Sequence, residues 1–166
     1  FTVMKKMKKI TLLLLFLGIS VFAFAQGPYR NAIGIHVGSF NGLTYKTFLS
    51  GSTALQIDAG LKLNFPGNDE GLVLGIEVNP NAMYQMEFNR VNGLYWLLGG
   101  GATLGVRTSK YSALKLGVNA IGGLEYKFRI PFAIQLDLRP GFGFIAGENA
   151  HGYFDWIASL GFRYTF

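Results

Sequence analysis

The chain contains no cysteine, and only 14% of its 166 residues are charged. The absence of cysteine excludes disulfides, thiolate metal sites and an acylated N-terminal cysteine. The charged fraction is well below the quarter or so that is usual in soluble proteins. Beyond the N-terminal region, no apolar run approaches the roughly 20 residues that a membrane-spanning helix needs. What is abundant instead is small and aromatic, with 23 Gly, 15 Phe and 8 Tyr.

Residues 1–25 have the organisation of a cleaved secretory signal peptide. The recognisable pattern starts at Met4, and residues 1–3 lie upstream of it. The basic segment MKKMKK at Met4–Lys9 is followed by the apolar run ITLLLLFLGISVFAF and by the small-x-small motif AFA at Ala23–Ala25. Cleavage removes four lysines, so the 15 basic residues fall to 11 against 9 acidic ones, a net charge of +2. The high isoelectric point therefore belongs largely to the export signal, and nucleic acid is not expected as a partner.

Residues 26–166 form one domain of short segments in which apolar and polar residues alternate. In TALQIDAGLKLNF, Thr53–Phe65, every second residue from Leu55 is apolar, whereas Asp58 and Lys62 lie between them. Successive side chains of a strand point to opposite faces, so this pattern predicts a strand with one apolar and one polar face. The segments predict an all-β, transmembrane, antiparallel up-and-down β-barrel of about eight strands: Asn31–Phe40, Leu43–Phe48, Thr53–Phe65, Leu72–Glu87, Leu94–Arg107, Leu114–Phe128, Pro131–Ile145 and Tyr153–Phe166.

Every charged residue within these segments lies on the polar face. A soluble eight-stranded barrel would turn this face to water, whereas a membrane barrel turns it inward, because lipid is its solvent. The face is rich in glycine and carries seven basic and six acidic residues, a balance that favours pairing across a narrow lumen. The predicted lumen network consists of Lys46, Asp58, Lys62, Glu77, Glu87, Arg107, Lys115, Glu125, Lys127, Asp137, Arg139, Asp155 and Arg163.

Aromatic residues of the apolar face gather at the strand ends. Two aromatic girdles are typical of a barrel whose ends lie at the two membrane interfaces. The alternative is a soluble barrel whose core the rings fill. One predicted girdle comprises Tyr84, Trp96, Tyr126, Phe128, Phe132, Tyr164 and Phe166, and the other comprises Phe65, Phe142, Phe144, Phe154 and Trp156.

The final segment, LGFRYTF, alternates in polarity up to Phe166. We expect this strand to pair with the first one, because an open sheet edge is not tolerated in lipid. FRYTF also resembles the C-terminal signature of Gram-negative outer-membrane barrels, a terminal Phe preceded by aromatics at alternating positions. The resemblance implies that Phe162, Tyr164 and Phe166 form an assembly signal for the barrel assembly machinery, and that the protein is located in the cell outer membrane.

Residues 32–166 resemble the small eight-stranded outer-membrane barrels of the OmpA/OmpX type. GLTYKTFLSGSTAL (Gly42–Leu55) and GLEYKFRIPFAIQLDLRP (Gly123–Pro140) are also similar to a widespread group of uncharacterised outer-membrane β-barrel domain proteins. The resemblance implies outer-membrane lipid, and other outer-membrane proteins, as partners, but no activity. The expected outer loops, at residues 39–42, 66–71, 108–113 and 147–152, are short, which disfavours an adhesin.

The interpretation that follows is a non-enzymatic structural or binding role, which includes service as a subunit of a larger membrane complex. One alternative is a narrow, porin-like pore for small solutes. Another is a lipid-modifying enzyme, which would use His36 or His151 with Ser39, Asp155 or Glu148. No motif indicates a cofactor or a metal.

One local irregularity is expected within a strand. Pro80, in NPN at residues 79–81, cannot donate to a strand ladder, so we expect a bulge or kink there.

Overall fold

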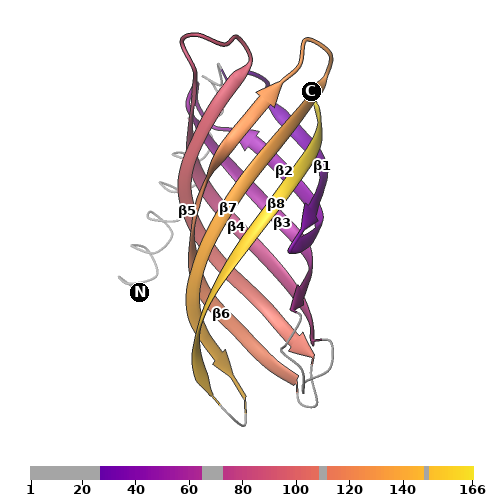
Figure 1. The fold of residues 1–166 in the computed structure, drawn as a ribbon, viewed down its shortest axis with the longest axis vertical. Helices are drawn as coiled ribbons and strands as arrows, with labels where there is room; N and C mark the ends of the chain where they lie inside the picture. The colour runs from indigo at the N-terminus through magenta and orange to yellow at the C-terminus, as the bar shows by residue number, and fades with distance from the viewer. Residues whose placement is uncertain (1–26, 65–72, 109–111, 148–149) are drawn as a thin grey trace, which may run out of the picture.

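Eight antiparallel strands follow one another around a closed barrel, in which β8 returns to pair with β1 (Figure 1). The structure is a computed structural model that describes residues 27–64, 73–108, 112–147 and 150–166, so the expected signal peptide lies outside the described residues. The predicted all-β up-and-down barrel is confirmed. Its strands are β1 (Asn31–Gly38), β2 (Phe40–Phe48), β3 (Thr53–Asn64), β4 (Val73–Glu87), β5 (Leu94–Thr108), β6 (Ser112–Lys127), β7 (Phe132–Ala146) and β8 (His151–Thr165).

The strands differ from the predicted segments mainly at the connections. β2 begins at Phe40 rather than Leu43, because only Ser39 separates it from β1. The loop expected at residues 147–152 is also shorter, since His151 is the first residue of β8 and pairs with Ile145. The position of His151 in a loop was therefore predicted wrongly. Among the described residues there is no helix long and apolar enough to cross a membrane.

The barrel is inside out relative to a soluble one. Outward-facing side chains such as Ile57, Leu104 and Leu136 are exposed, whereas Asp58 and Arg139 are buried in the interior. The alternation of the strands produces this arrangement, because each one-residue step moves a side chain to the opposite face. A continuous apolar surface of this size is stable against lipid rather than water.

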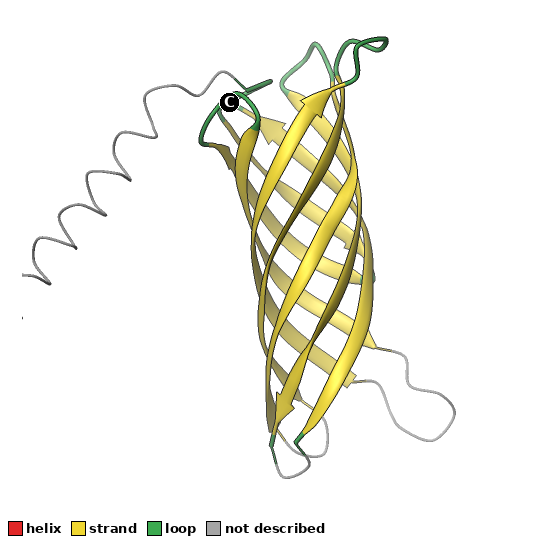
Figure 2. Ribbon diagram, turned by 90° about the vertical axis from the view of Figure 1, so that its left-hand side faces the viewer, coloured by secondary structure: helices red, strands yellow, loops and turns green. Residues whose placement is uncertain are grey.

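The two ends of the barrel carry different connections (Figure 2). We call one the turn end: it holds the β2–β3, β4–β5 and β6–β7 turns and Phe166. The other, the loop end, holds the β1–β2, β3–β4, β5–β6 and β7–β8 connections. Aromatic rings pack together at both ends, as in the pairs Tyr126–Phe128 at the turn end and Phe154–Trp156 at the loop end, with ring centroids 4.8 Å and 5.8 Å apart. Phe65, expected in the second group, lies outside the described residues.

Pro80 does not produce the expected bulge. It faces Ile57 in the ladder with β3, and the register with β5 is the same on both sides of it, at Val78–Leu104 and at Asn81–Gly101. No residue is inserted. The missing N–H of proline instead interrupts the pairing with β5 over two residues, without shifting the strands.

Among the residues that the structure describes, the barrel wall is complete at the turn end and open on one side at the loop end. At the turn end, Asn31 and Phe166 exchange two backbone hydrogen bonds of 2.8 Å, so the sheet closes there. β1 and β2 have only 8 and 9 residues, against 12 to 16 in the other strands. Their hairpin therefore ends at Ser39, well short of the β7–β8 tip (Figure 1). We call the missing piece of wall between β3 and β8, beyond Ser39 and Phe40, the notch.

Candidate functional site

A layer of polar side chains around Glu125 crosses the lumen nearest the turn end. The carboxylate of Glu125, on β6, accepts hydrogen bonds from Lys46 at 3.0 Å, from Gln85 at 2.8 Å and from Arg163 at 3.3 Å. These four residues come from β6, β2, β4 and β8 and are all essentially inaccessible to solvent. Because they converge from around the wall, they fill the cross-section of the barrel.

Tyr29, just before β1, closes the turn end on the outer side of this layer. Its hydroxyl donates to both carboxylate oxygens of Glu125, at 2.8 and 3.0 Å, and its ring packs edge-on against Phe48. Burial, and then the charge of Glu125, raises the pKa of the Tyr29 phenol well above its usual value of 10.0. The phenol is therefore held in its protonated, donating form. The ring rests on an inward-facing apolar layer of Phe48, Ala54, Met83, Leu97 and Ile121.

We call Tyr29 and the apolar layer under its ring the stopper. The sequence interpretation missed it, although a signal for the apolar layer was present. Phe48 lies two residues from Lys46, and Met83 two residues from Gln85, so period-2 alternation places them on the lumen face. An inward-facing group of apolar residues near the strand ends was thus available from the register. No such periodicity extends to Tyr29, which lies outside the strands.

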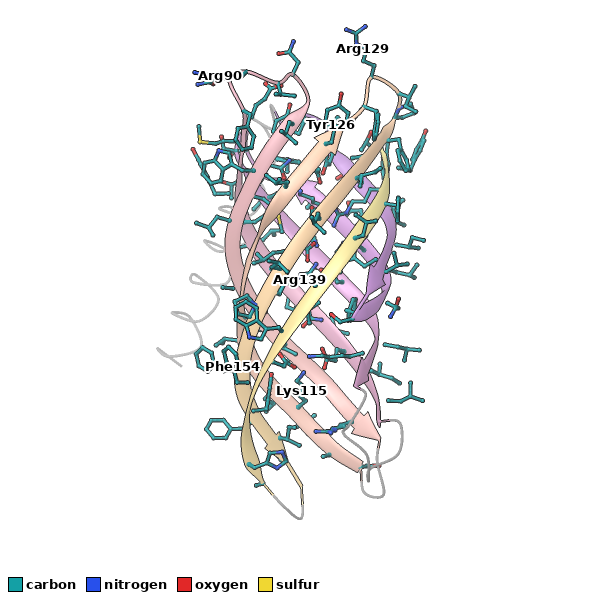
Figure 3. The ribbon with its side chains drawn as sticks, viewed as in Figure 1. Arg90, Lys115, Tyr126, Arg129, Arg139 and Phe154 are labelled. Carbon is teal, nitrogen blue, oxygen red and sulfur yellow. The ribbon has the colours of Figure 1, made fainter. Side chains whose placement is uncertain are left out.

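A second layer, centred on Arg139, lies at mid-height of the lumen (Figure 3). The guanidinium of Arg139 donates to Asp58 at 2.6 Å and to Asp137 at 2.8 Å. The hydroxyl of Ser159 donates to Asp137 at 2.9 Å. The ring of His36 lies against the same group, with Nδ1 3.1 Å from Arg139 Nη2.

Gly161 makes room for the His36 ring. A Cβ atom at Gly161 would lie 2.6 Å from His36 Nε2, which is closer than real Cβ contacts come. The small residue therefore lets the imidazole lie flat against the wall between the two layers, where its Nε2 is 2.8 Å from Arg163 Nη2. His36 is only 1% exposed.

Together the two layers form a plug with balanced charge. Each buried cation has at least one carboxylate within hydrogen-bonding distance, and buried charges are tolerated only when they are paired in this way. Gln135 connects the layers, because its amide oxygen accepts from Arg163 at 2.7 Å and its amide nitrogen donates to Asp137 at 2.7 Å. The plug contains three cations, Lys46, Arg139 and Arg163, and three anions, Asp58, Glu125 and Asp137.

Beyond the plug, toward the loop end, the polar side chains are less well paired. Asn119 donates to Asn81 at 2.7 Å. Both amide atoms of Asn79, the amide oxygen of Asn119 and one carboxylate oxygen of Glu77 have no hydrogen-bond partner within the described protein. Buried polar atoms are nearly always hydrogen-bonded, so this part of the lumen suits polar groups from outside the chain.

A cavity of about 240 Å³, which we call the vestibule, opens at the loop end. Lys115 lies 2.6 Å from Glu77 and 2.8 Å from Asp155, and Lys62 forms an ion pair with the same Asp155. The side chain of Asp155 is 24% exposed, unlike the carboxylates of the plug. Arg107 also lines the cavity. Figure 3 shows Lys115 and Phe154 in this half of the barrel.

The thirteen charged residues predicted for the lumen network divide into two groups. Nine are buried in the interior, while Glu87, Arg107, Lys127 and Asp155 are more exposed and lie toward the barrel ends. Glu87 and Lys127 bond to turn backbone instead, to Gly93 N at 2.8 Å and to Phe128 O at 2.6 Å. The nine are Lys46, Asp58, Lys62, Glu77, Lys115, Glu125, Asp137, Arg139 and Arg163.

The residues expected to signal assembly line one strip of the outer surface at the turn end. The rings of Tyr164 and Phe166 stack with centroids 6.2 Å apart, and Phe162 stacks on Phe132 at 6.5 Å. Tyr164 and Phe166 are exposed, whereas Phe162 is half-buried. They are therefore presented on the apolar surface rather than packed inside.

No predicted catalytic partner of His36 lies beside it among the described residues. Ser39 bonds to the backbone of Ala158, Asp155 belongs to the vestibule, and Glu148 lies outside the described residues. The hydroxyl of Ser159 does lie 3.5 Å from His36 Nδ1, but both residues are sealed within the plug. A substrate has no access to this group. The described residues also contain no His, Asp and Glu cluster suited to a metal.

No family model and no curated protein sequence matches the chain. Two solved structures are similar. One is the N-terminal β-barrel domain of Pseudomonas aeruginosa OprF, with a TM-score of 0.62 and 19% identity over 85% of this chain and 100% of that one. The other is Neisserial surface protein A, NspA, with a TM-score of 0.56 and 13% identity over 82% of this chain and 93% of that one. The chain thus has the fold of the small eight-stranded outer-membrane barrels of the OmpA/OmpX type.

Proposed function

We propose that the protein is an integral outer-membrane barrel with a non-enzymatic structural or binding role and a lumen that does not conduct. The observation that carries this proposal is the plug. Two layers of paired, buried charges cross the lumen, and Tyr29 closes the turn end. With about eight strands, a barrel interior is only wide enough for side chains to fill.

The location rests on the outward surface. Exposed aliphatic side chains lie between two groups of aromatic rings, which matches the apolar band and interfacial girdles of a membrane barrel. The solved relatives in fold are outer-membrane barrels, which supports the same location. In this orientation the turn end faces the periplasm and the loop end faces outward.

Three kinds of partner accompany the proposal. Outer-membrane lipid covers the apolar surface, and the barrel assembly machinery recognises Phe162, Tyr164 and Phe166. Other outer-membrane proteins are candidates for a larger complex. Nucleic acid is not proposed as a partner, since the charges of the barrel lie mostly in the lumen.

The alternatives of a pore and an enzyme are separated by direct measurement. We expect the protein to fractionate with outer membranes, to migrate on gels in a heat-modifiable way, and to give no steady current in planar bilayers. Lipid A mass spectra are expected to be the same with and without the protein. Stable channel openings would overturn the closed lumen, a changed lipid A would overturn the non-enzymatic role, and recovery from soluble periplasm would overturn the membrane location.

A further inference from the structure

We propose that the vestibule binds the phosphate headgroup of an outer-leaflet lipid, which enters sideways through the notch. The inference deepens the proposed binding role and rests on the membrane location proposed above. It combines three features: the notch, a cationic cavity directly behind it, and exposed aromatic rings at its edge.

The notch places the vestibule beside the membrane as well as the exterior. β3 and β8 are separated in the barrel by β2 and β1, yet Lys62 of β3 and Asp155 of β8 form an ion pair. This pair spans the gap just beyond the hairpin tip, because Phe40, the first residue of β2, is the ladder partner of Lys62. A side-chain pair replaces the missing backbone wall there, and side chains move aside more easily than strands.

The hairpin tip is built to lie in lipid. Asn41 bonds to the backbone of Gly38 through both atoms of its amide, at 3.2 and 2.8 Å. The Ser39 hydroxyl accepts from Ala158 N at 2.8 Å and donates to Ala158 O at 3.1 Å. Backbone groups in hydrocarbon require partners of this kind. The outward-facing side chains on either side, Val37 and Leu43, are apolar and exposed. Lipid chains can therefore lie directly against the rim of the notch that the β1–β2 hairpin forms.

Among the residues that the structure describes, the lining of the vestibule carries more cations than anions, in contrast to the balanced plug. Its three cations, Lys62, Arg107 and Lys115, come from β3, β5 and β6, and face two carboxylates, Glu77 and Asp155. Within the described part of the chain, Arg107 has no ion pair. Asp155 accepts from both lysines, so its carboxylate occupies the position that a phosphate oxygen would take. Lysine and arginine are the usual protein ligands of phosphate groups.

The rim of the notch that β8 forms carries aromatic side chains. Phe154 and Trp156 face outward on β8 and are 64% and 60% exposed, and Phe154 also lines the vestibule. Beyond Ala158, the edge of β8 that faces the notch has no backbone partner among the described residues. An amphiphile with a phosphate beside Lys62 and acyl chains over these rings satisfies both surfaces. A peptide strand paired to β8 would leave the cationic cavity unused.

The first experiment measures lipid retention by native mass spectrometry. The full protein is released from nanodiscs that contain phosphatidic acid and phosphatidylcholine with identical chains, and bound lipids are counted. We expect preferential retention of phosphatidic acid. Lys62→Gln is expected to reduce retention about tenfold, the effect of one charge-assisted hydrogen bond. Asp155→Asn is expected to raise it about threefold, because it frees both lysines from a competing anion.

A matched control removes the same charge at the other end. Lys127 donates to the carbonyls of Phe128 and Ile130 in the β6–β7 turn, far from the vestibule, so Lys127→Gln is expected to leave retention unchanged. Inorganic phosphate is added in a parallel series. If it competes fully with phosphatidic acid, the site binds free phosphate and the lipid proposal is wrong.

A second measurement locates the lipid. The chain has two tryptophans, so a Trp96→Phe variant reports on Trp156 alone. Phosphatidic acid with brominated chains is expected to quench Trp156 more than brominated phosphatidylcholine does, and Lys62→Gln is expected to abolish the difference. In a Trp156→Phe variant, Trp96 at the turn end is expected to show no headgroup preference.

The outcomes separate this inference from the proposed function. A protein that inserts and migrates heat-modifiably but retains both lipids equally, or retains less phosphatidic acid after Asp155→Asn, overturns only the inference. A retained mass that corresponds to a second copy or to a peptide overturns the choice of a lipid. Failure to insert into the nanodisc overturns the membrane location and the inference with it.

Discussion

The two halves of the lumen differ in how completely their buried polar side chains are paired. At the turn end, three cations and three anions pair within a fully walled barrel, and Tyr29 closes the entrance. At the loop end of the described barrel, the short β1 and β2 leave one side of the wall open. The buried amide atoms of Asn79 have no partner there among the described residues, and Asp155 is partly exposed. The comparison teaches that polar side chains in a barrel interior seal the lumen where they are completely paired, and leave polar atoms without partners where pairing is incomplete beside an opening.

The largest expected effect comes from opening the barrel wall at the turn end, which would remove the difference between the two halves. Deletion of Tyr164–Phe166 removes the paired hydrogen bonds between Asn31 and Phe166 and two outward-facing rings. Unpaired backbone groups in lipid cost several kcal/mol each, as an order of magnitude. We expect the truncated protein to fail assembly and to be degraded in the periplasm, as measured by membrane fractionation and immunoblotting. Normal amounts of heat-modifiable protein in the membrane would contradict this expectation.

A single substitution in each half sharpens the contrast. Glu125→Ala leaves Lys46 and Arg163 buried without their carboxylate, and removal of one partner from a buried pair costs about 3–5 kcal/mol. Asp155→Ala is expected to cost less than Glu125→Ala, because Asp155 is partly exposed and Lys115 keeps Glu77 as its partner. Urea unfolding in lipid vesicles, followed by the heat-modifiable gel shift, measures both. Equal losses of unfolding free energy would show that the loop end is as tightly constructed as the plug.

The contrast between the halves concerns the lumen, whereas the outer surface serves both. Leu136 pairs with Leu160, midway between the aromatic groups of β8, and is exposed on the apolar surface. Leu136→Arg is therefore expected to destabilise the barrel by about 2–4 kcal/mol, the cost of arginine near the bilayer midplane. Ser112→Arg, at the exposed start of β6, is the control and is expected to cost little. Equal tolerance of both variants would mean that the surface does not face lipid.

The smallest effect concerns the stopper. Tyr29→Phe removes one hydrogen bond to a carboxylate that keeps its other donors, and is expected to cost about 1.5 kcal/mol. Because burial raises the pKa of Tyr29, the unfolded chain ionises this phenol above about pH 10, where the folded chain does not. The tyrosine contribution is thus complete below pH 10 and is lost as the pH rises further. Urea midpoints between pH 8 and 11 should fall less steeply in Tyr29→Phe than in the wild-type protein, and parallel slopes would contradict the burial of this phenol.

Much of the fold was predictable because alternation is a local property of the chain. Leu55 to Leu61 and Asp58 to Lys62 already define two faces of β3, and the same period recurs in every strand. The position of Pro80 in a strand was also predictable, but the intact register around it was not. A bulge depends on how the neighbouring strands pair, and nothing in the residues 79–81 specifies that.

The sequence by itself determined that the chain forms a barrel, how many strands it has and which side chains face inward. The tertiary structure alone decided that Arg139 pairs with Asp58 across the lumen, that Lys62 meets Asp155 over a short hairpin, and that Tyr29 caps Glu125. The physical reason is that strand tilt and stagger set which inward-facing residues share a level. Alternation carries no information on these two quantities, because it repeats every two residues whatever the register.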